Sequence, residues 1–277
     1  MNQSAETIEQ NAPDYSAIKS KQQVAWGSGD YGRVGITLQI TGEQLCESLD
    51  MKAGGTVLDV AAGNGNVTLA AARRFGIVTS TDYVESLLEQ SKVRADAEGL
   101  DISFQQADAE DLPFSNESFD YVVSTFGVMF TPDQATSARE LHRVCKPGGK
   151  IGLVNWTPEG FIGQLFKVIG SHVSPPAGVK PPSAWGTEAF LNQHFGPRVQ
   201  SIKNTRRSFV FRYGSPNHWL NVFRTYYGPL LKAFEALDNE KAEQLEIDVL
   251  DLLDRMNVAT DGTLVLPSEY METVITR

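Results

Sequence analysis

The stretch 57–66, VLDVAAGNGN, joins an apolar run to a carboxylate, Asp59, and then to Gly63 and Gly65, one residue apart. Glycines in such a turn let backbone N–H groups approach a ligand, and the following helix directs its positive end at the same place. The dinucleotide fingerprint G-x-G-x-x-G is incomplete, because Thr68 occupies its third glycine position. Asp59 would repel a pyrophosphate, and it suits a ligand that carries a positive charge, such as an ammonium or a sulfonium. The stretch therefore predicts a site for a cationic adenosyl ligand.

Other residues that could bind a ligand lie where later predicted strands end. Asp82 and Asp108 each close a strand, and Ser124 and Phe126 end another. Ligands of doubly wound sheets bind at this edge, outside the carboxyl ends of the strands. Asp82 could accept both hydroxyls of a ribose there, and its alternative role is to cap a helix.

The positions of these residues are set by a regular alternation of strands and helices between residues 55 and 156. This alternation is typical of βαβ units around a parallel sheet. The predicted strands there are 55–60, 76–82, 102–108, 119–126 and 149–156, separated by helices at 66–75, 84–99 and 131–145. Beyond them, strands are predicted at 199–213 and 269–277, and helices at 157–173, 187–195, 216–236 and 239–256. The Pro-rich segment 174–186 is expected to form neither a helix nor a central strand.

The N-terminal region 16–50 is predicted to be helical, with four glycines that loosen residues 26–35 into a flexible loop. Trp26 and Tyr31 lie in this loop, and we expect them to form a lid over the ligand. The first dozen residues are expected to be disordered.

The composition excludes several classes of partner. The net charge of −10 and the pI of about 4.9 argue against a surface for nucleic acid or anionic lipid. We find no membrane span and no secretory signal, so we expect a cytoplasmic protein, either a monomer or a homodimer. Cys46 and Cys145 have no metal-ligand spacing, so we expect buried free thiols and no metal site.

Taken in order, the motifs resemble the class I S-adenosylmethionine-dependent methyltransferases, in particular the ubiquinone/menaquinone-type (methyltransferase type 11) branch of small-molecule enzymes. They are Asp59-x-Ala61-x-Gly63-x-Gly65, TSTDY, QADAEDLPF, SFDYVVSTFGVMF and RVCKPGGKIGLVNW. One departure is Ala61, where the family usually has glycine. The resemblance implies an α/β fold, a doubly wound, Rossmann-like sheet of seven strands in which 269–277 inserts antiparallel. We expect an α-helical cap and an N-terminal helical lid on this fold.

The resemblance also implies S-adenosylmethionine as cofactor and S-adenosylhomocysteine as product. It implies that Asp82 holds the ribose, that Tyr83 lies against the adenine, and that Asp108 accepts the adenine amino group beside the Ala109 N–H. The full predicted cofactor set is Trp26, Tyr31, Asp59, Ala61, Gly63, Gly65, Asp82, Tyr83, Asp108, Ala109, Ser124 and Phe126. The predicted acceptor pocket consists of Met129, Phe130, Trp156 and Trp185. Glu110 and Asp111 are expected to form a solvated turn, and the aromatic group 223–227 is expected to belong to the core of the cap.

We divide the chain into an N-terminal helical lid (1–50), a cofactor-binding core (51–160), and a region with the remaining strands and a helical substrate cap (161–277). The leading hypothesis is a methyltransferase acting on an O, N, S or C atom of a small, partly apolar metabolite. A quinone acceptor is disfavoured by the helical insert at 216–256. His172 and His218 are weak candidates for a general base. The alternatives are a non-catalytic S-adenosylmethionine-binding sensor or partner protein, and a nicotinamide-dependent oxidoreductase, which lacks support because of Asp59 and Thr68.

Overall fold

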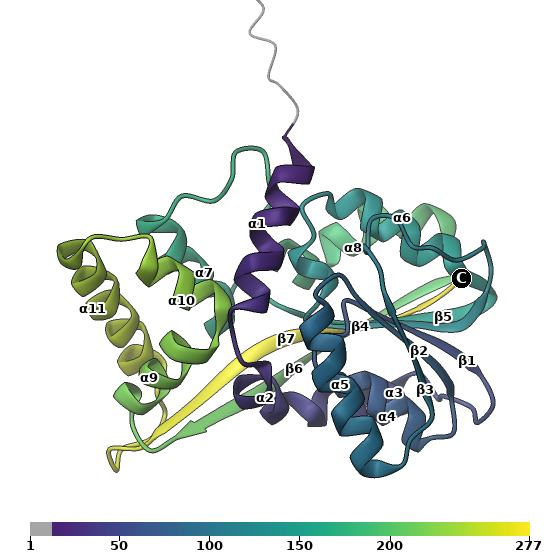
Figure 1. Cartoon of the computed structure of the whole chain (residues 1–277), viewed down its shortest axis with the longest axis horizontal. Coiled ribbons are helices and arrows are strands. Elements are labelled where there is room, and N and C mark those ends of the chain that lie inside the picture. The colour runs from purple at the N-terminus through teal and green to yellow at the C-terminus, as the bar shows by residue number, and fades with distance from the viewer. Residues whose placement is uncertain (1–12) are drawn as a thin grey trace, which may run out of the picture.

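The computed structural model describes residues 13–277. A single mixed sheet of seven strands, in the order β3-β2-β1-β4-β5-β7-β6, forms its centre (Figure 1). The strands are β1 (Thr56–Val60), β2 (Ile77–Asp82), β3 (Ile102–Gln106), β4 (Phe119–Thr125), β5 (Cys145–Trp156), β6 (Ser201–Tyr213) and β7 (Leu264–Thr276). Strands β1 to β5 pair in parallel, whereas β7 runs antiparallel to both β5 and β6. The predicted seven-stranded sheet with an antiparallel C-terminal strand is therefore confirmed.

The central strands are apolar on both faces because helices cover both sides of the sheet. In β1, Val57 and Leu58 are fully buried, as are Val122 and Val123 in β4. In Figure 1 the helices α3 (Gln39–Ser48), α4 (Asn66–Arg73) and α5 (Glu85–Glu98) lie below the sheet, and α6 (Gln134–Val144) and α8 (Glu188–His194) lie above it.

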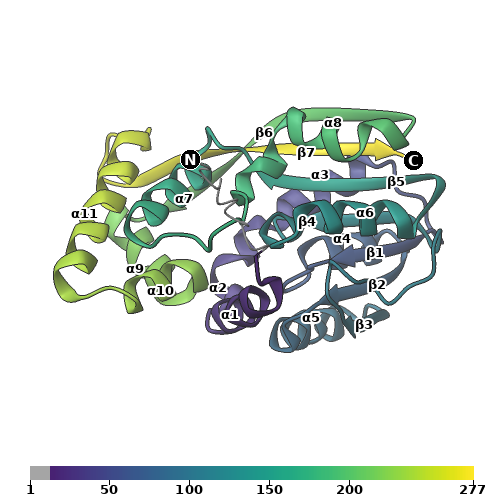
Figure 2. The ribbon, with the colours of Figure 1, turned by 90° about the horizontal axis from the view of Figure 1, so that it is seen from above.

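Strands β6 and β7 are each 13 residues long and extend beyond the rest of the sheet. The chain between them forms α9 (Pro216–Tyr226), α10 (Gly228–Glu235) and α11 (Asn239–Met256), which lie together with α7 (Phe161–His172) at one end of the molecule (Figures 1 and 2). We refer to α7 and α9–α11 as the cap. The predicted helix 216–236 is broken at Tyr227, where the backbone is extended.

The N-terminal helix α1 (Tyr15–Gly27) lies between the cap and the sheet domain (Figure 1). It is followed by α2 (Tyr31–Val34) and a short 3₁₀ helix, Ile36–Leu38. The prediction of a flexible loop over 26–35 is thus wrong, because α1 ends at Gly27 and only residues 28–30 separate it from α2. Asp30 caps α2 by accepting the Gly32 N–H, which explains why helix resumes there despite the glycines. The predicted disorder of the first dozen residues lies outside the described part of the chain.

Two smaller differences follow from local chemistry. Strand β5 already starts at Cys145, but its pairing with β4 jumps from Cys145 to Lys150, so residues 146–149 bulge out of the ladder. Within the Pro-rich segment, Pro182–Gly186 forms a 3₁₀ helix with proline at its start, where a missing N–H costs nothing.

Cys46 and Cys145 are buried and free, as predicted. Across residues 13–277, no helix is both long and apolar enough to cross a membrane.

Candidate active site

A single cavity follows the carboxyl ends of the parallel strands and continues under α1 and the cap. The carboxyl ends of β2 and β4, and the segments that follow β1, β2, β3 and β4, contribute residues 61–64, 82–83, 107–110 and 125–127 to its wall. The rest of the lining comes mostly from the N-terminal helices and the cap, with Lys19, Gln22, Trp26, Tyr31, Val34, Gly35, Leu38, Asn66, Leu87, Phe130, Thr131, Pro132, Trp156, Ile162, Phe211, Phe223 and Tyr227. Its position is the one that ligands occupy in doubly wound sheets.

The loop after β1 has an unusual backbone. Ala61 and Gly63, which line the cavity, and Gly65, which does not, all have positive φ, at 52°, 56° and 87°. A Cβ on Gly65 would lie 2.0 Å from the Ser91 Oγ, so only glycine fits there. Ala61 adopts a left-handed conformation that costs an L-residue about 1–2 kcal/mol, which glycine would not pay.

Asp59 lies behind this loop rather than in the cavity. It is fully buried, and the Thr68 hydroxyl donates a hydrogen bond to its Oδ2 at 2.5 Å. Burial raises the pKa of Asp59 to about 7, although the bond from Thr68 lowers it. Since Asp59 does not line the cavity, the structure does not support the predicted direct contact with a cationic ligand. Thr68 at the third glycine position thus binds one oxygen of this acid, while the Asp59 Oδ1 has no hydrogen-bond partner among residues 13–277.

Asp82 lines the cavity and is held from both sides by the backbone. Its Oδ2 accepts the Gly63 N–H and its Oδ1 accepts the Val84 N–H, both at 2.9 Å. It is almost fully buried, which raises its pKa to about 6 even though these backbone bonds lower it. The geometry is compatible with both roles considered for Asp82, because it binds the Val84 N–H just before α5 and its side chain also lines the cavity.

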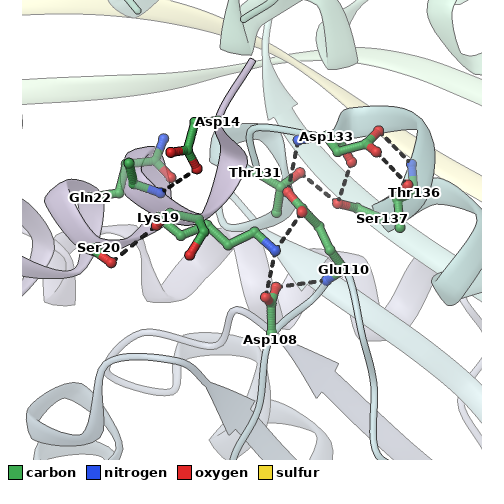
Figure 3. A network of polar contacts seen from close by, with 12 residues as sticks. Asp14, Lys19, Ser20, Gln22, Asp108, Glu110, Thr131, Asp133, Thr136 and Ser137 are labelled. Carbon is green, nitrogen blue, oxygen red and sulfur yellow. Dashed lines mark hydrogen bonds and ion pairs between the residues drawn. The ribbon is translucent and has the colours of Figure 1, made fainter. Parts of the chain in front are cut away.

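The acidic turn after β3 contributes two carboxylates to the cavity wall (Figure 3). Asp108 accepts the Glu110 N–H at 2.9 Å, and Lys19 of α1 lies 2.6 Å from both Asp108 and Glu110. The Glu110 side chain is only 6% exposed, so its expected place in a solvated turn is wrong. Asp111 is exposed, as expected. Tyr83 and Ala109, predicted to contact the adenine, also line this part of the cavity.

A second part of the cavity wall, which we call its aromatic end, is lined by aromatic rings. Phe126 stacks on Trp156 with ring centroids 4.0 Å apart, and the ring centroids of Trp26 and Phe130 are 4.6 Å apart. The ring centroids of Tyr31 and Trp26 are 5.6 Å apart, and the buried Tyr31 hydroxyl has no hydrogen-bond partner among residues 13–277. Burial raises the pKa of Tyr31 well above its ordinary value, so this hydroxyl stays neutral.

Several predicted site residues have other roles. Met129 and Trp185 are fully buried and do not line the cavity, so their assignment to an acceptor pocket is wrong. Trp185 instead packs on Phe190 at 4.6 Å. Ser124 is also outside the cavity, where its hydroxyl donates to the Val60 carbonyl and accepts the Val128 N–H. Gly65, as described above, shapes the loop without facing the cavity.

The two histidines considered as bases lie away from the cavity lining. The His172 Nε2 is 2.7 Å from Asp248 on α11, within the cap. The His218 Nδ1 accepts the Gly214 N–H at the start of α9. Neither histidine is placed to take a proton from a molecule bound in the cavity.

Sequence reasoning missed Lys19, Glu110, Phe223 and Tyr227, all of which line the cavity. Lys19 and Glu110 are 91 positions apart, and nothing in the sequence pairs them. The aromatic spacing at 223–227 did indicate one helix face, but it could not show that this face turns toward the sheet edge.

Comparisons with known proteins agree on one family. A family model described as "Methyltransferase domain" matches residues 58–153. A demethylmenaquinone methyltransferase of Deinococcus radiodurans is 32% identical over 162 residues, which cover 56% of this chain and 67% of that protein. An uncharacterized protein of Mycobacterium tuberculosis is 38% identical over 251 residues, covering 89% of this chain and 90% of that protein.

Among solved structures, a putative methyltransferase from Bacillus halodurans has a TM-score of 0.57 at 22% identity, covering 84% of this chain and 96% of that chain. This likeness shows a shared fold. The Deinococcus relative shows the family as well as the fold, because it is a methyltransferase. The alternative of a nicotinamide-dependent oxidoreductase is therefore rejected. The chain belongs to the class I S-adenosylmethionine-dependent methyltransferases, and S-adenosylmethionine is its cofactor.

Proposed function

We propose that the enzyme methylates a small, partly apolar metabolite on an O, N, S or C atom. The observation that carries this proposal is the aromatic end of the cavity, which is continuous with the polar end formed by Gly63 and Asp82. Aromatic rings bury large apolar areas and favour flat ligands, so this end suits an acceptor with an aromatic or conjugated part.

The polar end fits the adenosyl cofactor. Each Asp82 oxygen receives one backbone N–H and keeps a second lone pair, so the carboxylate can still accept two ribose hydroxyls. Apart from its two chain neighbours, no atom of residues 13–277 lies within 4 Å of the position of a Cβ on Gly63, which leaves space beside the loop backbone. We assign the adenine to Tyr83, Asp108 and the Ala109 N–H. When bound, S-adenosylmethionine supplies an electrophilic methyl group on a positively charged sulfur.

The acceptor is assigned to Phe126, Phe130 and Trp156, with Trp26 and Tyr31 closing the cavity from the N-terminal side. Phe126 and Trp156 sit at the ends of neighbouring strands, where rigid elements fix their rings. These residues orient the acceptor and exclude water, which are the main contributions an enzyme makes to a methyl displacement.

No residue in the described cavity wall is placed as a free general base. The wall contains no histidine among residues 13–277, and burial raises the pKa of both Tyr31 and Tyr227. Asp82 is held by backbone N–H groups, and Asp108 and Glu110 are paired with Lys19. This arrangement favours acceptors that react without proton removal by the protein, such as thiols, amines and ionised phenols.

The name of the Deinococcus relative points to a quinone precursor as one candidate acceptor for this chain. We favour a natural product or a xenobiotic instead, because α9, α10 and α11 form a large cap between β6 and β7 and contribute Phe223 and Tyr227 to the cavity. A larger aromatic chamber suits a more varied set of ring systems.

The test is a turnover assay that measures S-adenosylhomocysteine release with a panel of phenols, thiols, aryl amines and quinols. We expect turnover with at least one flat aromatic acceptor. Turnover only with strongly polar or highly charged acceptors would contradict the proposal. Tight cofactor binding without turnover on any member would contradict it as well, and would favour the alternative of a non-catalytic sensor or partner protein.

A further inference from the structure

Helix α1 is attached to the rest of the protein partly by side-chain hydrogen bonds to backbone carbonyls. It contains no buried residue, and Val24 on it is 65% exposed. Its side chains nevertheless make hydrogen bonds across the cavity. Gln22 donates to the Phe130 carbonyl at 3.0 Å and Gln23 donates to the Tyr83 carbonyl at 3.2 Å. Together with the packing of Trp26 against Phe130 and Tyr227, and of the end of α1 against Gly228 at the start of α10, these bonds hold the helix over the cavity.

The shortest of these contacts come from Lys19. Its Nζ lies 2.6 Å from the Asp108 Oδ2 and 2.6 Å from the Glu110 Oε2 (Figure 3). Within residues 13–277, Lys19 is the one cation paired with either carboxylate. We call Lys19, Asp108 and Glu110 the α1 triad.

The α1 triad is fixed from the sheet side. The Glu110 Oε1 accepts the Asp133 N–H at 2.8 Å, and the Asp108 Oδ1 accepts the Glu110 N–H at 2.9 Å. One oxygen of each carboxylate is therefore bound by a backbone N–H, and the other oxygen is bound by Lys19.

The triad differs from an ordinary surface ion pair, which contributes little to stability because water screens it. The side chains of Lys19 and Glu110 are only 23% and 6% exposed. Burial alone lowers the pKa of Lys19, but the hydrogen bonds to Asp108 and Glu110 outweigh it and raise that pKa above its ordinary value. Lys19 thus remains charged, and its removal would leave two neighbouring carboxylates without a cation.

Asp108 belongs to two arrangements at once, since it lines the polar end of the cavity and anchors α1. We propose that Lys19 is a cofactor-positioning residue, which draws α1 across the adenosyl end of the cavity and holds Asp108 in the orientation that faces the cofactor. The proposal requires cofactor binding alone, so it is independent of the identity of the acceptor.

Two consequences follow from this coupling. Cofactor binding and closure of α1 stabilise each other, because the Lys19–Asp108 contact that favours the closed helix also orients Asp108 toward the cofactor. Release of the product then requires Lys19 to leave Asp108, so the same residue affects how fast the product dissociates.

The experiment compares Lys19→Met with Lys21→Met in the full chain. Lys21 lies on the same helix, is exposed, and makes no ion pair within the described residues, so both variants remove one positive charge. S-adenosylhomocysteine is the probe, since it has no net charge that would respond to the substitution. Its Kd is measured by calorimetry, and amide hydrogen exchange of residues 15–27 is measured with and without it.

We expect Lys19→Met to weaken binding roughly fivefold to thirtyfold, the range for charge-assisted bonds that are partly exposed. It should also abolish most of the protection that the ligand gives to residues 15–27. Lys21→Met should match the wild type in both measurements. A Kd for Lys19→Met within twofold of wild type, or undiminished ligand-dependent protection, would overturn the proposal.

A double variant separates positioning from folding. Lys19→Met with Glu110→Gln removes the unpaired buried charge and keeps the net charge of the wild type. We expect its melting temperature to recover relative to Lys19→Met while residues 15–27 stay unprotected by ligand. Full recovery of ligand-dependent protection would show that Lys19 only neutralises Glu110, and would overturn the positioning role. Lys19→Arg, which keeps the charge, should retain most of the wild-type affinity.

Discussion

The assignment of Asp82 to the ribose leads to the most specific prediction. The change is Asp82→Asn, which keeps the size of the side chain and removes its charge. The carboxylate accepts the Gly63 and Val84 N–H groups, one on each oxygen, and the predicted ribose hydroxyls would use the remaining lone pairs. An amide retains one accepting oxygen and presents an NH₂ group to the other two donors, so one hydroxyl loses its acceptor.

The magnitude follows from that count. One charge-assisted hydrogen bond is lost and the other is weakened, which gives an expected loss of about 1–3 kcal/mol, or roughly 5–150-fold in Kd. The assay is calorimetric titration with S-adenosylhomocysteine, with NAD as a ligand that should not bind. Glu89→Gln, an exposed charge removal on α5, is the control. If the affinity of a folded Asp82→Asn variant equals that of the control, the ribose is not at Asp82.

The remaining predictions concern pH, the acceptor end and the histidines. Burial raises the pKa of Asp59 to about 7 and that of Asp82 to about 6, both from 3.8, so between about pH 4 and 7 the folded state binds more protons than the unfolded state. These two groups make the ligand-free protein less stable as pH rises through this range, and Asp59→Asn should flatten the dependence in urea unfolding, whereas an unchanged slope would contradict the assignment. Trp156→Leu removes the ring that stacks on Phe126, and should raise the KM for an aromatic acceptor roughly tenfold, by about 1.4 kcal/mol, while the Kd for S-adenosylhomocysteine stays at its wild-type value. His172→Asn and His218→Asn should leave kcat unchanged, because neither side chain lines the cavity, and a bell-shaped pH profile lost in either variant would show otherwise.

The order of the sheet domain was predictable because each element has a local signal. Asp82 ends a β-branched run and Asp108 follows β3 by two residues, and the carboxyl ends of parallel strands meet at one edge whatever the details of packing. Their common place in the cavity wall therefore followed from sequence. The last strand was predicted over 269–277, with its antiparallel insertion implied by the family resemblance, and it is observed as Leu264–Thr276.

Whether an apolar residue faces the cavity or the core was less predictable. Phe126 and Met129 are three residues apart after β4, yet Phe126 faces the cavity and Met129 is core. The chain turns sharply between them, with Phe126 at a φ of 53° and a 3₁₀ helix at Val128–Phe130. A strand or helix period does not extend through such a turn, so an apolar residue there gives no indication of the side it faces.

Long-range pairings were not predictable from one sequence. Lys19 appeared as one charge on a polar helix, and Glu110 as one acid in an acidic turn. Their contact depends on how α1 crosses the sheet edge, which tertiary packing decides. Asp59 was a related case, because its position was identified correctly but its partner is a buried hydroxyl, Thr68, rather than a ligand.

A crystal structure of the complex with S-adenosylhomocysteine tests the central claim most directly. We expect the ribose hydroxyls within hydrogen-bond distance of Asp82, the adenine between Tyr83 and the Asp108 turn, and the sulfur facing the aromatic end near Phe126. An adenosyl group bound outside this cavity, or one inverted so that the adenine lies against Phe126 and Trp156, would contradict the account.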